Sequence, residues 1–382
     1  MPERRAAEVF PPGEFIKEEL EARNWSQAEL AEIIGRQPSV VHELISGKRI
    51  VSPEIAMALG EAFGTSAEYW MNLESMYQLW HVNNGDSAIS RRARLYHVAP
   101  IKEMVRRHWI EPSENIDILE KSIRDFFEIK DLDKPPTLAH AARRGRQEIS
   151  TTSQNTWLFR ARQLACGVYA KSFSMQSFAN CLVQLRKLLH SVQEIRHIPR
   201  ILSENGIRFL ILEHLPQTRI DGVTFWLDSK SPVIVLSLRY DRIDAFWYTL
   251  AHELGHVKRK DGSKDDALID TDLIGDEYYA MNDGLEAERQ ANSFAAEFLI
   301  SHRDMDDFIS RVRPLYGTQK IIGFAKRIGI HPGIVVGQLQ FKNEIPWSAY
   351  RKLLDKVRHI IIPSTLTDGW GQTITISLNK EA

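Results

Sequence analysis

The sequence predicts a mostly helical α+β protein built from three parts. Apolar residues recur at helical spacing through most of the first 195 residues, while short apolar runs near residues 215–238 have the length of strands and are followed by two more helical patterns. We expect a five-helix domain over residues 10–80, a helical middle domain over 81–195, a domain with a small mixed or antiparallel sheet over 196–345, and a C-terminal extension over 346–382.

The composition predicts a cytoplasmic protein with no membrane partner. The 382 residues carry a formal net charge of -1, which argues against a polyelectrolyte partner for the chain as a whole. No apolar segment follows the N-terminal Met-Pro-Glu-Arg-Arg, and no apolar run is long enough to cross a bilayer. Cys166 and Cys181 lack the spacing of a metal or redox motif, so we expect both to be reduced and buried.

The first eighty residues contain two short helical segments joined by a tight glycine turn. Ser26 is the expected N-cap of the first, with Glu29 completing a capping box, and Gly35 ends that helix. The second begins near Gln37 and stops at Gly47. This arrangement is typical of a helix-turn-helix. The five expected helices cover residues 14–23, 27–34, 36–46, 53–63 and 66–80.

This segment resembles the Xre/HigA-type DNA-binding domain. The resemblance covers residues 10–80 and is carried by Ser-Gln-x-Glu-Leu-Ala at 26–31 and Gly-Lys-Arg at 47–49. It implies a homodimer on a double-stranded DNA operator. On the second helix, the side chains expected to reach base edges are Gln37, Ser39, His42 and Glu43. The expected phosphate contacts are Ser26, Gln27, Lys48 and Arg49.

The charge of this domain leaves an alternative open. Residues 10–80 contain five Lys/Arg against eleven Glu, an unfavourable balance for binding a polyanion. The basic stretch Arg91–Arg107 is a possible additional contact to the DNA backbone. The alternative is a helical bundle that dimerises without binding DNA.

The middle of the chain is helical and carries no motif of its own. Asn83–Asp86 and Lys134–Pro136 are expected breaks. We expect this part to space or couple the two flanking domains. The expected helices are residues 101–110, 116–127, 156–169 and 173–189.

The sequence His252-Glu-Leu-Gly-His256 is the most informative motif in the chain. Histidines four residues apart lie on one face of a helix, so both imidazoles can reach a single metal ion. Glu253, beside the first histidine, is the expected general base toward a water on that metal. The alternative is a buried helix whose histidines are only hydrogen-bonded.

A second helical segment, residues 285–300, offers a third ligand. Glu288 shares the apolar face that contains Ala291, and a carboxylate there is costly to bury unless it is paired or binds a metal. Asn292, one turn on, is placed to orient a metal ligand. Glu286 is the rival carboxylate. Two histidines and one glutamate leave an open coordination position, as in catalytic sites.

These motifs resemble the ImmA/IrrE-type metallopeptidases, a gluzincin-like group. The resemblance covers about residues 195–345 and rests on His252-Glu-Leu-Gly-His256 with Glu288-x-x-Ala-Asn-x-Phe-Ala295. It implies that Leu215–Pro216, Asp221–Asp228 and Pro232–Leu238 lie on strands lining a cleft. This chain departs from the family at Phe298–Ser301, where a Leu-Leu-Met-Pro-like sequence is usual.

The resemblance implies a zinc-dependent endopeptidase, with Mn²⁺ as another ion that would suit the ligands. The implied substrate is a repressor or antitoxin protein. The alternative is a non-catalytic HigA-like antitoxin and autorepressor, whose peptidase-like domain binds only a metal or a partner such as a cognate toxin. Tyr248, Tyr278 and Tyr279 are candidates for stabilising the oxyanion. His331, before a proline in a turn, is expected to cap a helix.

Overall fold

The computed structural model describes residues 9–82, 88–132, 151–261, 268–271 and 286–374. The chain divides into two compact units, Met1–Arg91 and Arg92–Ala382. In the described part of the chain, no helix is both long and apolar enough to cross a membrane.

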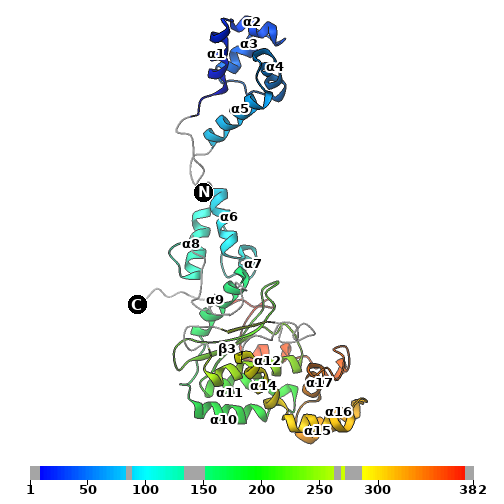
Figure 1. The fold of residues 1–382 in the computed structure, drawn as a ribbon. Helices are drawn as coiled ribbons and strands as arrows, with labels where there is room; N and C mark the ends of the chain where they lie inside the picture. Colours follow the sequence, from blue (N-terminus) through cyan, green and yellow to red (C-terminus); the bar gives the residue numbers. More distant parts are fainter. Residues whose placement is uncertain (1–8, 83–87, 133–150, 262–267, 272–285, 375–382) are drawn as a thin grey trace. The chain divides into compact units, whose positions relative to one another are not determined.

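The first unit is the expected five-helix domain (Figure 1). Ser26 and Glu29 form the predicted capping box, in which the Glu29 backbone N–H donates to Ser26 Oγ at 3.2 Å and the Ser26 N–H donates to Glu29 Oε2 at 2.7 Å. Ile16, Leu30 and Trp70 are fully buried in its core. The helices are α1 (Pro12–Arg23), α2 (Gln27–Ile33), α3 (Pro38–Ile45), α4 (Pro53–Phe63) and α5 (Ala67–Val82).

The second unit is built on a mixed sheet in the order β4-β2-β3-β1-β5. β2 pairs antiparallel with β3 and β4, whereas β1 pairs parallel with β3 and β5. The strands are β1 (Arg208–Leu212), β2 (Ile220–Trp226), β3 (Pro232–Leu236), β4 (Leu268–Thr271) and β5 (Leu366–Asp368). The predicted class, mostly helical α+β with a small mixed sheet, is confirmed.

Helices cover both faces of this sheet, because its strands are apolar on both sides (Figure 1). Leu210, Val223 and Val235 face one helical layer, whereas Ile211 and Ile234 face the other. The first layer is α6 (Ala88–Val98), α7 (Ile101–Arg106), α8 (Ile116–Phe127) and α9 (Thr152–Cys166). The second side carries α10 (Met175–Arg186), η2 (Val192–His197), α11 (Ile198–Glu204), α12 (Ile243–Arg259), α14 (Glu286–Leu299), α15 (His302–Val312), α16 (Thr318–Ile328), α17 (Pro332–Phe341), η3 (Arg351–Leu353), α18 (Arg358–Ile361) and η4 (Ile362–Ser364).

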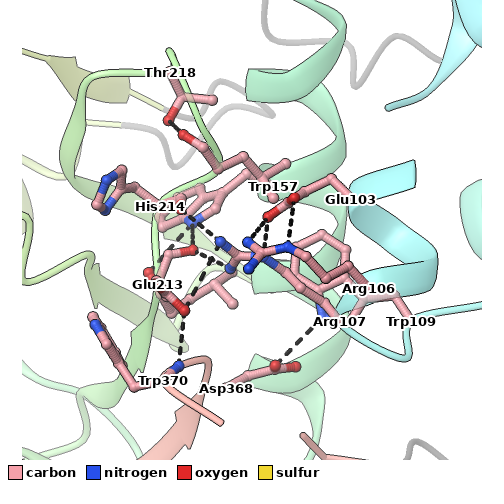
Figure 2. A network of polar contacts seen from close by, with 12 residues as sticks. Glu103, Arg106, Arg107, Trp109, Trp157, Glu213, His214, Thr218, Asp368 and Trp370 are labelled. Carbon is pink, nitrogen blue, oxygen red and sulfur yellow. Dashed lines mark hydrogen bonds and ion pairs between the residues drawn. The ribbon is translucent and has the colours of Figure 1, made fainter. Parts of the chain in front are cut away.

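Polar contacts fasten the first helical layer to the chain after β1 and to β5 (Figure 2). The Arg107 guanidinium donates to the carbonyl oxygens of Glu213 and His214, both at 2.8 Å. Arg160 on α9 forms an ion pair with Asp368 at 2.5 Å, and both side chains are almost fully buried. Most of the helical middle of the chain is therefore part of the second unit, where α6–α9 cover one face of the sheet and α10 packs on the other.

Several sequence-based expectations need correction. Leu215–Pro216 lies in the loop between β1 and β2, while β1, β5 and α6 were not anticipated. Cys166 is exposed, although Cys181 is buried as expected. α12 ends at Arg259, and Lys260 follows it in the left-handed conformation.

Candidate metal centre and nucleic-acid interface

α12 is buried along almost its whole length, and it carries both histidines of the motif. Residues 243–257 are all buried, and His252, Glu253 and His256 are completely inaccessible to solvent. A Cβ on Gly255 would stand 3.0 Å from the Cα of Ala291, so α12 and α14 approach closely at this point. This close approach brings Glu288 of α14 to the histidines.

The donor atoms of His252, His256 and Glu288 have the spacing of a tetrahedral metal site. The two Nε2 atoms are 3.0 Å apart, and Glu288 Oε2 lies 3.4 Å from that of His252 and 3.7 Å from that of His256. Zinc–ligand bonds of about 2.0–2.2 Å at tetrahedral angles place donors roughly 3.3 Å from one another. The three residues therefore fit a divalent metal ion.

Each histidine uses its other ring nitrogen to contact a polar side chain. His252 Nδ1 lies 2.8 Å from Asn292 Oδ1, which also accepts a hydrogen bond from the Tyr248 hydroxyl at 2.9 Å. His256 Nδ1 lies 3.1 Å from Asp261 Oδ2. Such contacts fix the ring orientation and leave Nε2 for the metal.

The two carboxyl groups beside the histidines, Glu288 and Asp261, have pKa values below their ordinary values. Burial opposes ionisation of Glu288, but the adjacent His252 and His256 outweigh it and hold its pKa below the ordinary value. Burial also opposes ionisation of Asp261, where hydrogen bonds from His256 and Arg259 likewise lower the pKa. An ionised Glu288 is the form that binds a metal.

Two residues of β2 position the Glu253 carboxylate. Thr224 Oγ1, which is fully buried, donates a 2.6 Å hydrogen bond to Glu253 Oε2. Gly222, two residues earlier on the same face of the strand, leaves the space that the carboxylate occupies. Sequence reasoning missed Gly222, Thr224 and Asp261. The only signals for them were Asp-Gly-x-Thr in an expected strand and an aspartate just past the motif helix.

The other candidates in this unit occupy different positions. Glu286 is exposed and forms an ion pair with Arg289 at 2.7 Å, so it points away from the histidines. Tyr248 lies beside Asn292, whereas Tyr278 and Tyr279 lie outside the described residues. His331 is the N-cap of α17, where its Nδ1 accepts from the Gly333 N–H at 3.1 Å.

The predicted base-reading helix has an exposed face. Gln37 is the N-cap of α3, and Gln37, Ser39 and His42 are exposed. Glu43 is partly buried and forms an ion pair with Arg49 at 2.7 Å. Glu43, which was predicted to contact a base, is therefore paired with Arg49, which was predicted to contact a phosphate.

The phosphate candidates also lie at the surface. Ser26, Gln27 and Lys48 are exposed, although the Ser26 hydroxyl caps α2. Not all of the basic stretch Arg91–Arg107 is available to contact DNA, because Arg107, its last residue, is buried. Arg107 is buried and bonded to Glu213 and His214, so it is engaged inside the second unit.

Comparisons with known proteins match both parts of the chain. Residues 16–70 match a helix-turn-helix family, and residues 203–334 match the IrrE N-terminal-like domain. The chain is 35% identical over 68 residues to the uncharacterised HTH-type transcriptional regulator YddM of Escherichia coli, spanning 18% of this chain and 72% of that protein. It is 34% identical over 73 residues to antitoxin HigA-1 of Vibrio cholerae, spanning 19% of this chain and 69% of that antitoxin.

A solved structure of Pseudomonas aeruginosa antitoxin HigA with the higBA promoter is 29% identical. It matches 25% of this chain and 99% of its own, with a TM-score of 0.21. The matched segments define a helix-turn-helix, HigA-antitoxin-like regulator fused to a peptidase-like domain. The chain belongs to the family of HTH-type transcriptional regulators.

Proposed function

We propose that this regulator carries a zinc-dependent endopeptidase, which cleaves a repressor or antitoxin protein in the cytoplasm. The observation that supports the enzyme is the convergence of His252, His256 and Glu288, with Glu253 directly after His252 in the same turn of α12. A structural zinc site would normally use four protein ligands, whereas three leave a position for substrate or water.

In this proposal, the chain's own residues divide the chemistry among them. His252, His256 and Glu288 would hold the metal, and Asn292 would orient His252 through the 2.8 Å contact. A zinc ion there would supply a nucleophile at neutral pH by acidifying water, and would polarise the peptide carbonyl. Glu253 would accept the proton of the attacking water and deliver it to the leaving amine. Thr224 keeps that carboxylate in place through its hydrogen bond.

The first unit would bind an operator as a homodimer, since one helix-turn-helix of this size covers a single half-site. Gln37, Ser39 and His42 present polar atoms on the exposed side of α3, which is where base edges would be contacted. Lys48 would contact phosphates. Binding would be salt-sensitive because Lys48 would displace counterions from phosphates, and the affinity would be modest because the domain is acidic overall.

A second candidate function is a non-catalytic antitoxin and autorepressor that binds a cognate toxin. The observation that favours it is the similarity of the N-terminal segment to an antitoxin. In this case, the metal site would stabilise the second unit without turnover.

The Glu253→Gln variant separates the two candidates. Glutamine is nearly isosteric but cannot accept a proton, so the variant should bind metal and lack proteolysis. N-terminal peptide profiling of cells expressing the wild type, Glu253→Gln or the exposed control Glu286→Gln measures this without a known substrate. New N-termini should appear with the wild type and Glu286→Gln alone. Identical profiles for all three would reject the peptidase and favour the antitoxin.

A further inference from the structure

Asp261 follows the end of α12, and both its backbone N–H and its backbone carbonyl form hydrogen bonds. Lys260 adopts the left-handed conformation (φ 60°), and its N–H donates to Val257 O at 3.1 Å. The Asp261 N–H donates to His256 O at 3.0 Å, which completes a Schellman-type helix end. The Asp261 carbonyl accepts a 2.8 Å hydrogen bond from Trp226 Nε1 of β2. These bonds fix the Asp261 backbone relative to His256.

The Asp261 side chain lies between an imidazole and a guanidinium. Its Oδ2 is 3.1 Å from His256 Nδ1 and 3.0 Å from Arg259 Nε, and the side chain is 18% exposed. The left-handed region is unfavourable for lysine, because its Cβ crowds the following carbonyl oxygen, whereas glycine adopts it freely. The helix end nevertheless adopts this turn, which directs the aspartate back toward the histidine.

The two histidines of the site have chemically different partners. Asn292 offers His252 a neutral amide oxygen, whereas Asp261 offers His256 a carboxylate. A carboxylate that accepts the Nδ1 proton fixes the tautomer with the Nε2 lone pair toward the metal, and it makes that nitrogen a stronger donor.

We propose that Asp261 is a positioning residue for the metal centre, acting through His256. Its carboxylate orients the imidazole and strengthens the His256–metal bond. The inference rests on the metal site of the proposed function, but it does not require peptidase activity.

The test is the affinity of the full chain for Zn²⁺, measured by competition with a chromogenic chelator. Asp261→Ala should weaken binding about 10- to 100-fold, the range found when a partner of a metal-bound histidine is removed. Asp261→Asn keeps an acceptor without the charge and should fall between Asp261→Ala and the wild type. Glu286→Ala removes an exposed carboxylate near Glu288 and should bind Zn²⁺ as the wild type does.

A second readout distinguishes positioning from general loss of stability. The visible absorption spectrum of the Co²⁺-loaded protein depends on ligand geometry, so it should change in both Asp261 variants and remain unchanged in Glu286→Ala. Thermal melts in excess chelator compare the stabilities of the metal-free proteins. If Asp261→Ala fails to fold, the Zn²⁺ affinity and Co²⁺ spectrum of Asp261→Asn decide the test. Wild-type affinity and an unchanged Co²⁺ spectrum in Asp261→Asn, or in a folded Asp261→Ala, would overturn the proposal.

These measurements distinguish the absence of a metal site from the absence of peptidase activity. A wild-type chain that binds no Zn²⁺ would overturn this inference together with the metal site. A chain that binds Zn²⁺ with the expected Asp261 dependence but cleaves no protein would support the inference and reject only the peptidase.

Discussion

The carboxylate of Glu253 occupies the space that a side chain at Gly222 would require. A Cβ on Gly222 would overlap Glu253 Oε1 and stand 3.0 Å from Cδ. Thr224, on the same strand, holds the other carboxylate oxygen. The strand therefore constrains the proposed general base by both an absent side chain and a hydrogen bond.

Gly222→Ala should displace Glu253 while leaving the metal ligands in place. Because a displacement of about 1 Å at a catalytic group can cost about 100-fold in rate, we expect proteolysis to fall by roughly that factor with metal content unchanged. The comparison variant is Gly323→Ala in α16, where an added Cβ meets no atom within 4 Å. That change should stabilise the protein by about 0.5–1 kcal/mol without altering activity. Equal activity of both variants would contradict the constraint on Glu253.

The amount of bound zinc should depend on the three predicted ligands but not on Glu286. His252→Ala, His256→Ala and Glu288→Ala each remove one donor and should reduce bound zinc from about one ion per chain to near zero. Glu286→Ala should leave it unchanged, because Glu286 is bonded to Arg289 at the surface. Elemental analysis after dialysis measures this directly. Full metal content in Glu288→Ala would exclude Glu288 as a ligand.

The buried pair Arg160–Asp368 should be worth far more to stability than a surface pair. Asp368→Ala leaves the Arg160 guanidinium buried without its carboxylate, and losing one member of such a pair typically costs about 3–5 kcal/mol. Asp306→Ala breaks an exposed pair with Lys342 and should cost less than about 1 kcal/mol. Urea denaturation, following the transition of the second unit, compares them. Similar midpoints for both variants would show that the α9–β5 contact is dispensable.

DNA recognition should separate into base and phosphate contributions. Gln37→Ala should relax the preference at one base pair by about 1–3 kcal/mol, whereas Lys48→Ala should weaken all sequences alike and flatten the salt dependence. Mobility-shift titrations of the full chain on its own promoter, at two salt concentrations, measure both effects. The absence of any shift at low salt would leave the dimerising bundle as the function of the first unit.

The two cysteines should differ in reactivity toward a thiol reagent. Burial raises the pKa of Cys181 to about 12, so its thiolate is scarce and shielded, whereas Cys166 is exposed at the end of α9. At pH 8, one thiol per native chain should react rapidly and the second only after denaturation. Cys166→Ser should abolish the rapid phase. Two rapidly reacting thiols would show that Cys181 is accessible.

Local patterns in the sequence determined much of the secondary structure. The capping box at Ser26, the glycine turn at Gly35 and the apolar spacing of residues 53–63 predicted helices that the structure contains. The same reasoning placed His252 and His256 on one face of a helix. These features depend on contacts between residues a few positions apart, which the order of residues specifies directly.

Tertiary structure alone decided which distant residues meet. β5 joins the sheet by pairing with β1, although the two strands lie far apart in the sequence. Helices α6–α9 cover a sheet face that the strand pattern left unassigned. Gly222 and Thr224 enclose Glu253 only because β2 packs against α12. Asp261 reaches His256 because Lys260 turns the chain back at the helix end. Such pairings depend on packing between elements, so no periodicity along the chain could reveal them.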